Sequence, residues 1–141
     1  KTQLEVTDVS KLPVMNSHSL SKRMYDVARN LDDKTLESFS KNKGVVGAIF
    51  DKNMIGREKD LHSLIEHMMY VHDSYGPDIL AIGTDYFGFP KGNAATGLED
   101  ISKIGNLFTG LQEAGLGDED IEKVAYKNAI RVMKANARRW A

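Results

Sequence analysis

Three polar side chains, His18, Asp51 and Asp85, each stand at the end of a short apolar run of this chain. The runs have the length and composition of buried strands. Because the carboxyl ends of parallel strands meet at one edge of a sheet, these side chains are expected to face a common site. An imidazole can ligate a metal or move a proton, and a carboxylate can do the same. On spacing alone, a surface loop histidine with no role is the favoured interpretation of His18, because a lone histidine is a weak signal.

Strands are predicted over residues 12–19, 44–50 and 78–85. Helices are predicted between and after these strands, over 33–43, 60–75, about 101–115 and from Asp118 onwards. Residues 2–11 are predicted to be the tail of a further helix that leads into the first strand. Residues 21–30 are expected to form a loop with one helical turn, and 51–59 a polar loop. The alternation of strands and helices predicts the α/β class, with parallel strands adjacent in sequence order and helices on one side of the sheet.

Residues that favour helix ends set the expected boundaries. The Asp-Asp pair at 32–33 is expected to cap the second helix, and Gly44 to end it in a left-handed conformation. Asp118 is expected to cap the last helix, with the arginines at 138–139 near its C-terminal end. The Gly-rich, aromatic segment 85–98 is expected to be a loop and matches no phosphate-binding pattern.

Composition restricts the classes of function. The chain has 141 residues, an ordinary length for one domain, and 41% of them are hydrophobic. Its 19 basic and 20 acidic residues nearly cancel, so neither a nucleic acid nor a charged membrane surface is indicated as a partner. No apolar run approaches the roughly 20 residues of a membrane span. Since there is no cysteine, a metal would have to be held by His, Asp or Glu.

The strand count suggests a larger fold. Three parallel strands make a narrow sheet with two open edges, which parallel sheets normally avoid. A (β/α)₈ barrel takes about 250 residues. Residues 1–141 are therefore interpreted as a single C-terminal portion, the last three βα units of such a barrel plus C-terminal helices, with the N-terminal strands absent.

Six short segments occur here in a specific order, namely Pro13–Ser19, Arg29-Asn30, Asp32-Asp33, Ile82–Asp85, Gly97–Asp100 and Asn128–Val132. Together they resemble the membrane (renal) dipeptidase family of zinc peptidases, and the similarity runs through essentially all 141 residues. The resemblance implies a (β/α)₈ barrel with two zinc ions at its carboxyl face, and zinc-dependent hydrolysis of dipeptides.

The resemblance also implies roles for three residues. His18 corresponds to a zinc-ligating histidine, and a neutral imidazole is a good zinc ligand. Arg29 corresponds to the arginine that binds the substrate carboxylate, which a guanidinium can grip with two hydrogen bonds. Asp85 corresponds to the aspartate that contacts the substrate and carries the proton of the tetrahedral intermediate.

Two departures from the family pattern matter. The family's His-x-Asp pair, bridging glutamate and second zinc histidine precede the segment seen here, so the 141 residues alone are expected to be inactive. The family often has Asp-Phe-Asp at the catalytic aspartate, whereas Tyr86 and Phe87 follow Asp85 here. Substrate preference therefore stays open.

The remaining candidates have structural interpretations. His62, His67 and His72 are five residues apart, a spacing that does not place them on one helix face, so structural or solvated roles are expected. Ser17 and Ser19 are expected to be hydrogen-bond donors in the loop.

A complete, non-catalytic α/β module that binds a small anion through Arg29 is the competing hypothesis. The expected partners are a dipeptide substrate and a second copy of the chain, because the family that the sequence resembles often forms homodimers. The sequence assigns no cellular compartment.

Overall fold

The computed structural model describes residues 2–137, so the arginines at 138–139 lie outside the described part. Its elements are α1 (Thr2–Val9), β1 (Met15–Ser19), α2 (Asp33–Lys41), β2 (Val45–Ala48), α3 (Lys52–Ile55), α4 (Leu61–Tyr75), the 3₁₀ turn η1 (Pro77–Ile79), β3 (Leu80–Ile82), η2 (Ile101–Lys103), α5 (Ile104–Glu113), α6 (Asp118–Glu122), the π-helical turn η3 (Lys123–Lys127) and α7 (Asn128–Ala137). Within residues 2–137, no helix combines the length and the apolar character needed to cross a bilayer.

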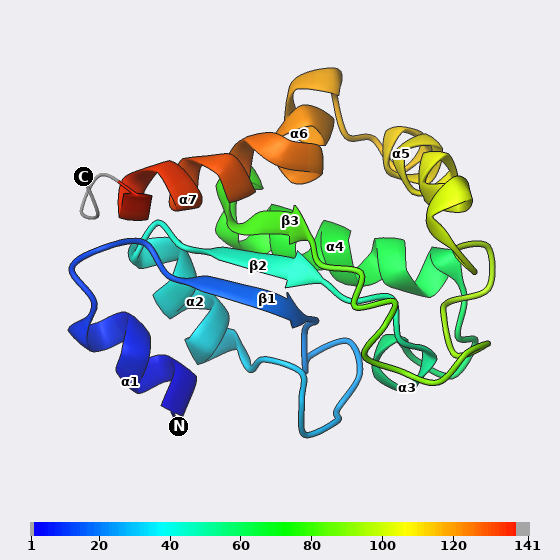
Figure 1. Ribbon diagram of the computed structural model, residues 1–141, viewed down its shortest axis with the longest axis horizontal. Coiled ribbons are helices and arrows are strands. Elements are labelled where there is room, and N and C mark those ends of the chain that lie inside the picture. The colour runs from blue at the N-terminus through cyan, green and yellow to red at the C-terminus, as the bar shows by residue number, and fades with distance from the viewer. Residues whose placement is uncertain (1, 138–141) are drawn as a thin grey trace.

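The sheet confirms the predicted α/β class. The three strands lie in the order β1-β2-β3, and both neighbouring pairs are parallel. Figure 1 shows the loop over residues 20–31, α3 and the loop over 85–98 together at the carboxyl ends of the strands. The topology thus gathers three loops that are far apart in sequence at one edge.

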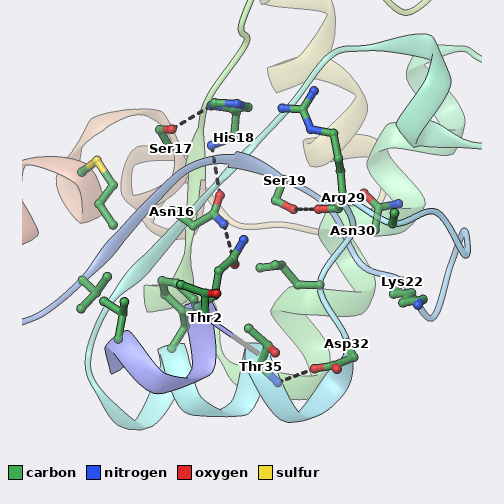
Figure 2. A pocket seen from close by; sticks show the side chains of 17 residues that line it. Thr2, Asn16, Ser17, His18, Ser19, Lys22, Arg29, Asn30, Asp32 and Thr35 are labelled. Atoms are coloured by element: carbon green, nitrogen blue, oxygen red, sulfur yellow. Dashed lines mark hydrogen bonds between the residues drawn. The ribbon is translucent and has the colours of Figure 1, made fainter. Parts of the chain in front are cut away.

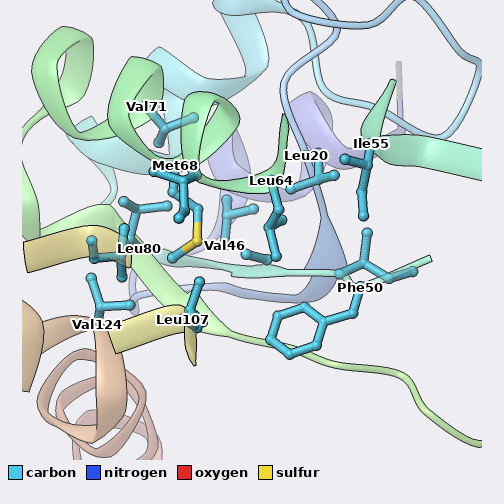
Figure 3. Packing of buried hydrophobic residues seen from close by; sticks show 14 of the residues in the cluster. Leu20, Val46, Phe50, Ile55, Leu64, Met68, Val71, Leu80, Leu107 and Val124 are labelled. Atoms are coloured by element: carbon cyan, nitrogen blue, oxygen red, sulfur yellow. The ribbon is translucent and has the colours of Figure 1, made fainter. Parts of the chain in front are cut away.

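Most of the apolar core lies on one face of the sheet. Val46 and Leu80 belong to the same buried cluster as Leu64 and Met68 of α4, and Figure 3 shows these side chains together. Phe39 brings α2 into this cluster. The predicted helices over 33–43 and 60–75 therefore cover this face, as their apolar periodicity indicated.

The prediction that helices lie on one side only is wrong. Val132 of α7 packs with Val45 and Ala81, which point to the opposite face from Val46 and Leu80. α7 lies near the amino-terminal ends of β2 and β3 (Figure 1). Alternate residues of a strand face opposite sides of the sheet, so Val45 and Ala81 form a second apolar face. The apolar side of α7 that carries Val132 packs against this face.

Two predicted helix ends also need correction. The left-handed residue after α2 is Lys43, with φ of 58°, and not Gly44. Gly44 is required for another reason, because a Cβ there would lie 2.5 Å from the carbonyl oxygen of Val14. Gly117 is the N-cap of α6, so Asp118 is the first helical residue rather than the cap, where its charge still favours the positive end of the helix dipole.

Some local structure departs from the predicted pattern. The predicted polar loop 51–59 contains α3, which starts after Asp51, whose carboxylate accepts from the backbone N–H of Asn53 at 2.9 Å. The predicted last helix is interrupted by the π-helical turn η3. Asn128 follows this turn, is 2% exposed, and donates from Nδ2 to the carbonyl oxygens of Pro77 at 2.8 Å and Leu80 at 2.9 Å. These bonds attach the C-terminal helix to the start of β3.

His67 is a buried titratable group on α4. Its side chain is 2% exposed, and Nε2 lies 2.7 Å from the carbonyl oxygen of Ile55 at the end of α3. Nδ1 has no partner among the described residues. Burial disfavours the charged imidazolium and lowers the pKa of His67 to about 4.

We predict an acid-sensitive stability that depends on His67. The pKa of a histidine is about 6.5 in the unfolded chain, so the unfolded state takes up a proton first as pH falls. The stabilising effect of the neutral side chain is fully present above pH 6.5 and is lost as pH falls towards 4, by about 3 kcal/mol. Urea unfolding between pH 7 and pH 4 measures this loss.

His67→Gln keeps a neutral donor towards Ile55 and should weaken the pH dependence. His62→Gln on the exposed side of the same helix is the matched control and should leave it unchanged. The same steep pH dependence in His67→Gln would contradict the assignment.

Candidate active site

β1 ends in a bulge that brings His18 to the carboxyl edge of the sheet. Asn16 pairs with Val46 and Ser19 with Ala48, so two residues of β1 stand opposite one residue of β2. The side-chain oxygen of Asn16 accepts from the backbone N–H of His18 at 3.1 Å, which stabilises the irregular backbone. Bulges of this kind redirect side chains and are frequent beside active sites.

Two glycines make room for the bulge. The carbonyl oxygen of Ser17 lies against Gly47 and Gly83, where a Cβ would approach it to 2.2 Å and 1.9 Å respectively. These are backbone contacts that no rotamer change could relieve. The neighbouring strands are therefore held close together directly below His18.

His18 and Asp85 come together across the sheet. Nε2 of His18 lies 3.7 Å from Oδ2 of Asp85, with the two side chains 35% and 24% exposed. Nδ1 of His18 lies 2.7 Å from the hydroxyl oxygen of Ser17. The ring thus has one nitrogen engaged by a neighbouring hydroxyl and the other directed towards the carboxylate and solvent.

Asp85 adopts an uncommon backbone conformation. Its φ is 57°, in the left-handed region that Asp tolerates better than most residues. Its carbonyl oxygen accepts from the N–H of Gly88 at 2.8 Å, which closes a tight turn. A Cβ on Gly88 would lie 2.2 Å from Oδ1 of Asp85, so the carboxylate occupies space that only glycine leaves free.

The next residues hold this turn against the core. The ring of Tyr86 packs edge-on against Phe50 and Phe89, and its hydroxyl donates to the carbonyl oxygen of Leu98 at 3.1 Å. Burial raises the pKa of Tyr86. Phe87 is fully exposed at the tip of the turn. The loop is therefore anchored by one aromatic residue and presents another.

Arg29 stands on the loop that follows β1. The loop is closed at its base, where Leu31 N–H donates to Leu20 at 2.8 Å and Lys22 N–H donates to Leu31 at 2.7 Å. Arg29 and His18 both line a hollow of about 740 Å³ beside β1, and their side chains extend to the same side of the strand (Figure 2). Within residues 2–137, the exposed guanidinium has no hydrogen-bond or salt-bridge partner.

Asp51 does not join this group. Its side chain is buried, caps α3 and accepts a hydrogen bond from Nδ2 of Asn93. The expectation that three strand ends supply three site residues therefore holds in the structure for His18 and Asp85 alone.

Sequence reasoning missed residues that support the site. Asn30 is buried and bonds two carbonyl groups, and Gly88 accommodates the Asp85 carboxylate. Ser19 was expected to be a loop donor, and its hydroxyl donates to the carbonyl oxygen of Arg29 at 2.7 Å. The spacing Asp85-x-x-Gly88 is a turn signal that could have indicated the glycine. A single Asn after an arginine carries no such signal.

His18 is the group in this site best suited to hold a metal. Its side chain is partly exposed, and its other ring nitrogen, Nδ1, lies at hydrogen-bonding distance from a hydroxyl, as in many metal-bound histidines. In the part of the chain that the structure describes, no three His, Asp or Glu side chains are grouped as a metal site would require. A metal at His18 therefore needs further ligands from other residues.

We predict that Gly88→Ala displaces the Asp85 carboxylate. The glycine has no positive φ, so alanine is acceptable to its backbone and the clash falls on Oδ1 of Asp85. A crystal structure of the variant should show the gap between His18 and Asp85 wider than 3.7 Å. Gly105→Ala, in open space on α5, is the control. An unchanged gap in Gly88→Ala would refute the steric argument.

Comparison with known proteins identifies relatives along the whole chain. The family model described as membrane dipeptidase (Peptidase family M19) matches residues 1–140. Dipeptidase ataJ of Aspergillus terreus is 31% identical over 137 residues, covering 94% of this chain and 33% of the relative. Dipeptidase verJ of Clonostachys rogersoniana is 32% identical over 133 residues, covering 94% and 34%. The chain spans about a third of the length of these curated relatives.

Solved structures share the fold. An amidohydrolase from Pseudomonas aeruginosa superposes with a TM-score of 0.85 at 25% identity, covering 96% of this chain and 49% of that one. A metallopeptidase from Rhodobacter sphaeroides, solved with a phosphinate mimic of the dipeptide L-Ala-D-Ala, gives a TM-score of 0.86 at 20% identity and covers 96% and 39%. With the family match over residues 1–140, the chain belongs to the membrane dipeptidase family of metallopeptidases, Peptidase family M19.

Proposed function

We propose that this chain contributes the carboxyl-terminal part of the active site of a zinc-dependent dipeptidase. The observation that carries the proposal is the approach of His18 to Asp85, 3.7 Å apart at the carboxyl edge of a parallel sheet. Together with Arg29 on the adjacent loop, the site offers a metal ligand, a proton carrier and a cation for a free carboxylate. These are the groups that hydrolysis of a short peptide requires.

We infer that the three strands are the last βα units of a (β/α)₈ barrel. β1 and β3 each have one edge without a strand partner among the described residues. Val6 and Met15, beside the free edge of β1, line the hollow there and stay about two-fifths exposed. Further strands at these edges would cover apolar surface and satisfy the free backbone groups.

In the proposed enzyme, His18 would be one of the residues that hold zinc. The hydroxyl oxygen of Ser17 would then accept a hydrogen bond from Nδ1–H, which favours the tautomer that leaves Nε2 free to bind a metal. A bound zinc ion supplies Lewis acidity and lowers the pKa of water. The remaining ligands would come from residues outside this sequence, so the 141 residues alone should not hydrolyse dipeptides.

The other two residues act on the substrate. Arg29, with an unengaged guanidinium, binds the C-terminal carboxylate and so favours peptides with a nearby free end. Asp85 is held by the tight turn and by Gly88, and its partly exposed carboxylate can take up and release a proton at the scissile amide. A fixed carboxylate suits proton transfer because its geometry does not have to be established in each turnover.

We predict that Asp85→Asn in the full-length enzyme lowers kcat by roughly two to four orders of magnitude, the usual contribution of a general acid–base group. The amide keeps the shape of the side chain but cannot carry the proton, so bound zinc measured by metal analysis should not change. His18→Ala is the contrasting variant and should lose zinc. Loss of one zinc ion in Asp85→Asn would make Asp85 a ligand and refute the proposed role.

We predict that Arg29→Ala raises KM for dipeptides far more than it changes zinc content. The side chain would contact the substrate carboxylate and no metal, so ground-state binding suffers most. Steady-state kinetics with metal analysis on the same preparations separates the two effects. Lys22→Ala, on the same loop and also beside the hollow, serves as the control. An unchanged KM in Arg29→Ala would exclude the carboxylate clamp.

A further inference from the structure

We propose that Asn30 is a positioning residue that fixes Arg29, and thereby sets the preference of the enzyme for substrates with a free carboxylate. This inference rests on the proposed function of Arg29. Asn30 is 5% exposed and lines the same hollow as Arg29, but its amide oxygen is buried and its amide nitrogen is used in two hydrogen bonds to backbone carbonyl groups. It acts through the backbone of the residue next to it.

The amide of Asn30 joins two separate loops. Nδ2 donates to the carbonyl oxygen of Tyr25 at 2.9 Å, within the loop that carries Arg29. The same nitrogen donates to the carbonyl oxygen of Met54 at 2.9 Å, near the end of α3 after β2. One side chain therefore fixes the curvature of the Arg29 loop and attaches that loop to the next one at the carboxyl edge.

The second attachment reaches the rigid part of the fold. Met54 and Ile55 are the last two residues of α3, whose final carbonyl groups have no partner inside so short a helix. Asn30 bonds the first of them, and His67 of α4 lies 2.7 Å from the second. Through α3, the loop of Arg29 is thus connected to the longest helix of the core.

Arg29 is held through its own carbonyl oxygen and through the residue that follows it, while its side chain has no hydrogen-bond partner among the described residues. Its carbonyl oxygen accepts from the buried hydroxyl of Ser19 at 2.7 Å, and the next residue is the anchored Asn30. A long side chain on a mobile loop would lose much rotamer and loop entropy on gripping a carboxylate. Because the backbone of Arg29 is already fixed, binding would cost the rotamer entropy of its side chain and little loop entropy.

The contribution of Asn30 to the fold lies in the two hydrogen bonds that its Nδ2 donates. Oδ1 of Asn30 is buried and has no partner among the described residues, so the side chain is not retained for its acceptor. Alanine would remove the side-chain donor from the carbonyl group of Met54 and one of the two donors from that of Tyr25, which also accepts from the N–H of Val27. The link between the two loops would be lost, and the loop of Arg29 would shift to recover solvent or new partners.

The chain offers a close control for a purely structural effect. Asn128 is also buried and also donates from Nδ2 to two carbonyl groups, but at the amino-terminal end of the sheet. Asn128→Ala removes the same chemistry from a place remote from Arg29. Any effect common to both variants reflects stability, and an effect restricted to Asn30 reflects the site.

The experiment compares a dipeptide with the same dipeptide carrying a C-terminal amide, in the full-length enzyme. The ratio of their kcat/KM values measures recognition of the carboxylate. We expect Asn30→Ala to lower this ratio roughly 10- to 100-fold, as small displacements of binding groups do. Asn128→Ala should leave the ratio at its wild-type value even where it lowers stability. The double variant Arg29→Ala, Asn30→Ala should show no further loss beyond Arg29→Ala.

Equal losses on both substrates in Asn30→Ala, or a further fall in ratio in the double variant, would overturn the positioning role. If Arg29→Ala itself leaves the ratio unchanged, the carboxylate clamp fails and the role of Asn30 fails with it. If Arg29→Ala lowers the ratio and Asn30→Ala does not, only the inference on Asn30 is wrong. Should the alanine variant not fold, Asn30→Ser, which can retain one donation, gives the same comparison with a smaller expected loss.

Discussion

The contact of the Ser17 carbonyl oxygen with Gly47 and Gly83 is the constraint on which the site depends. It allows β1 to bulge without moving away from β2, and the bulge delivers His18 to the carboxyl edge. Gly83 is also two residues before Asp85, so the same close packing fixes the strand that supplies the carboxylate. Side chains at either glycine would separate the strands and with them the two reactive groups.

A second constraint is the satisfaction of buried carbonyl groups where strands enter and leave the sheet. Asn128 bonds two of them at the amino-terminal end, and Asn30 bonds two at the carboxyl end. His67 lies within hydrogen-bonding distance of another at the end of α3. An unpaired carbonyl in the interior costs about as much as a lost hydrogen bond, so these amides stabilise the loops. The guanidinium of Arg29, in contrast, has no such partner among the described residues.

Much of this architecture follows from the sequence. Apolar runs ending in His18 and Asp85 predicted the strands, and periodic apolar residues predicted α2 and α4. The rest depends on contacts between distant segments. Gly44 suggested a helix end by its type, but its role is set by Val14, the residue that precedes β1. α7 covers the second face of the sheet because of Val45 and Ala81, whose orientation depends on strand register. Asn30 likewise depends on Met54, 24 residues away.

The exposure of the three candidate residues fits a division of labour within the site. His18 and Asp85 are partly shielded and held by short-range backbone geometry, which suits the roles proposed for them as a metal ligand and a proton carrier. Arg29 is exposed, and only its backbone is fixed. A guanidinium that met a buried carboxylate of the protein would already be neutralised and would gain little from a substrate. Fixing the backbone through Ser19 and Asn30 therefore leaves the charge of Arg29 unoccupied, as the proposed binding of a substrate carboxylate would require.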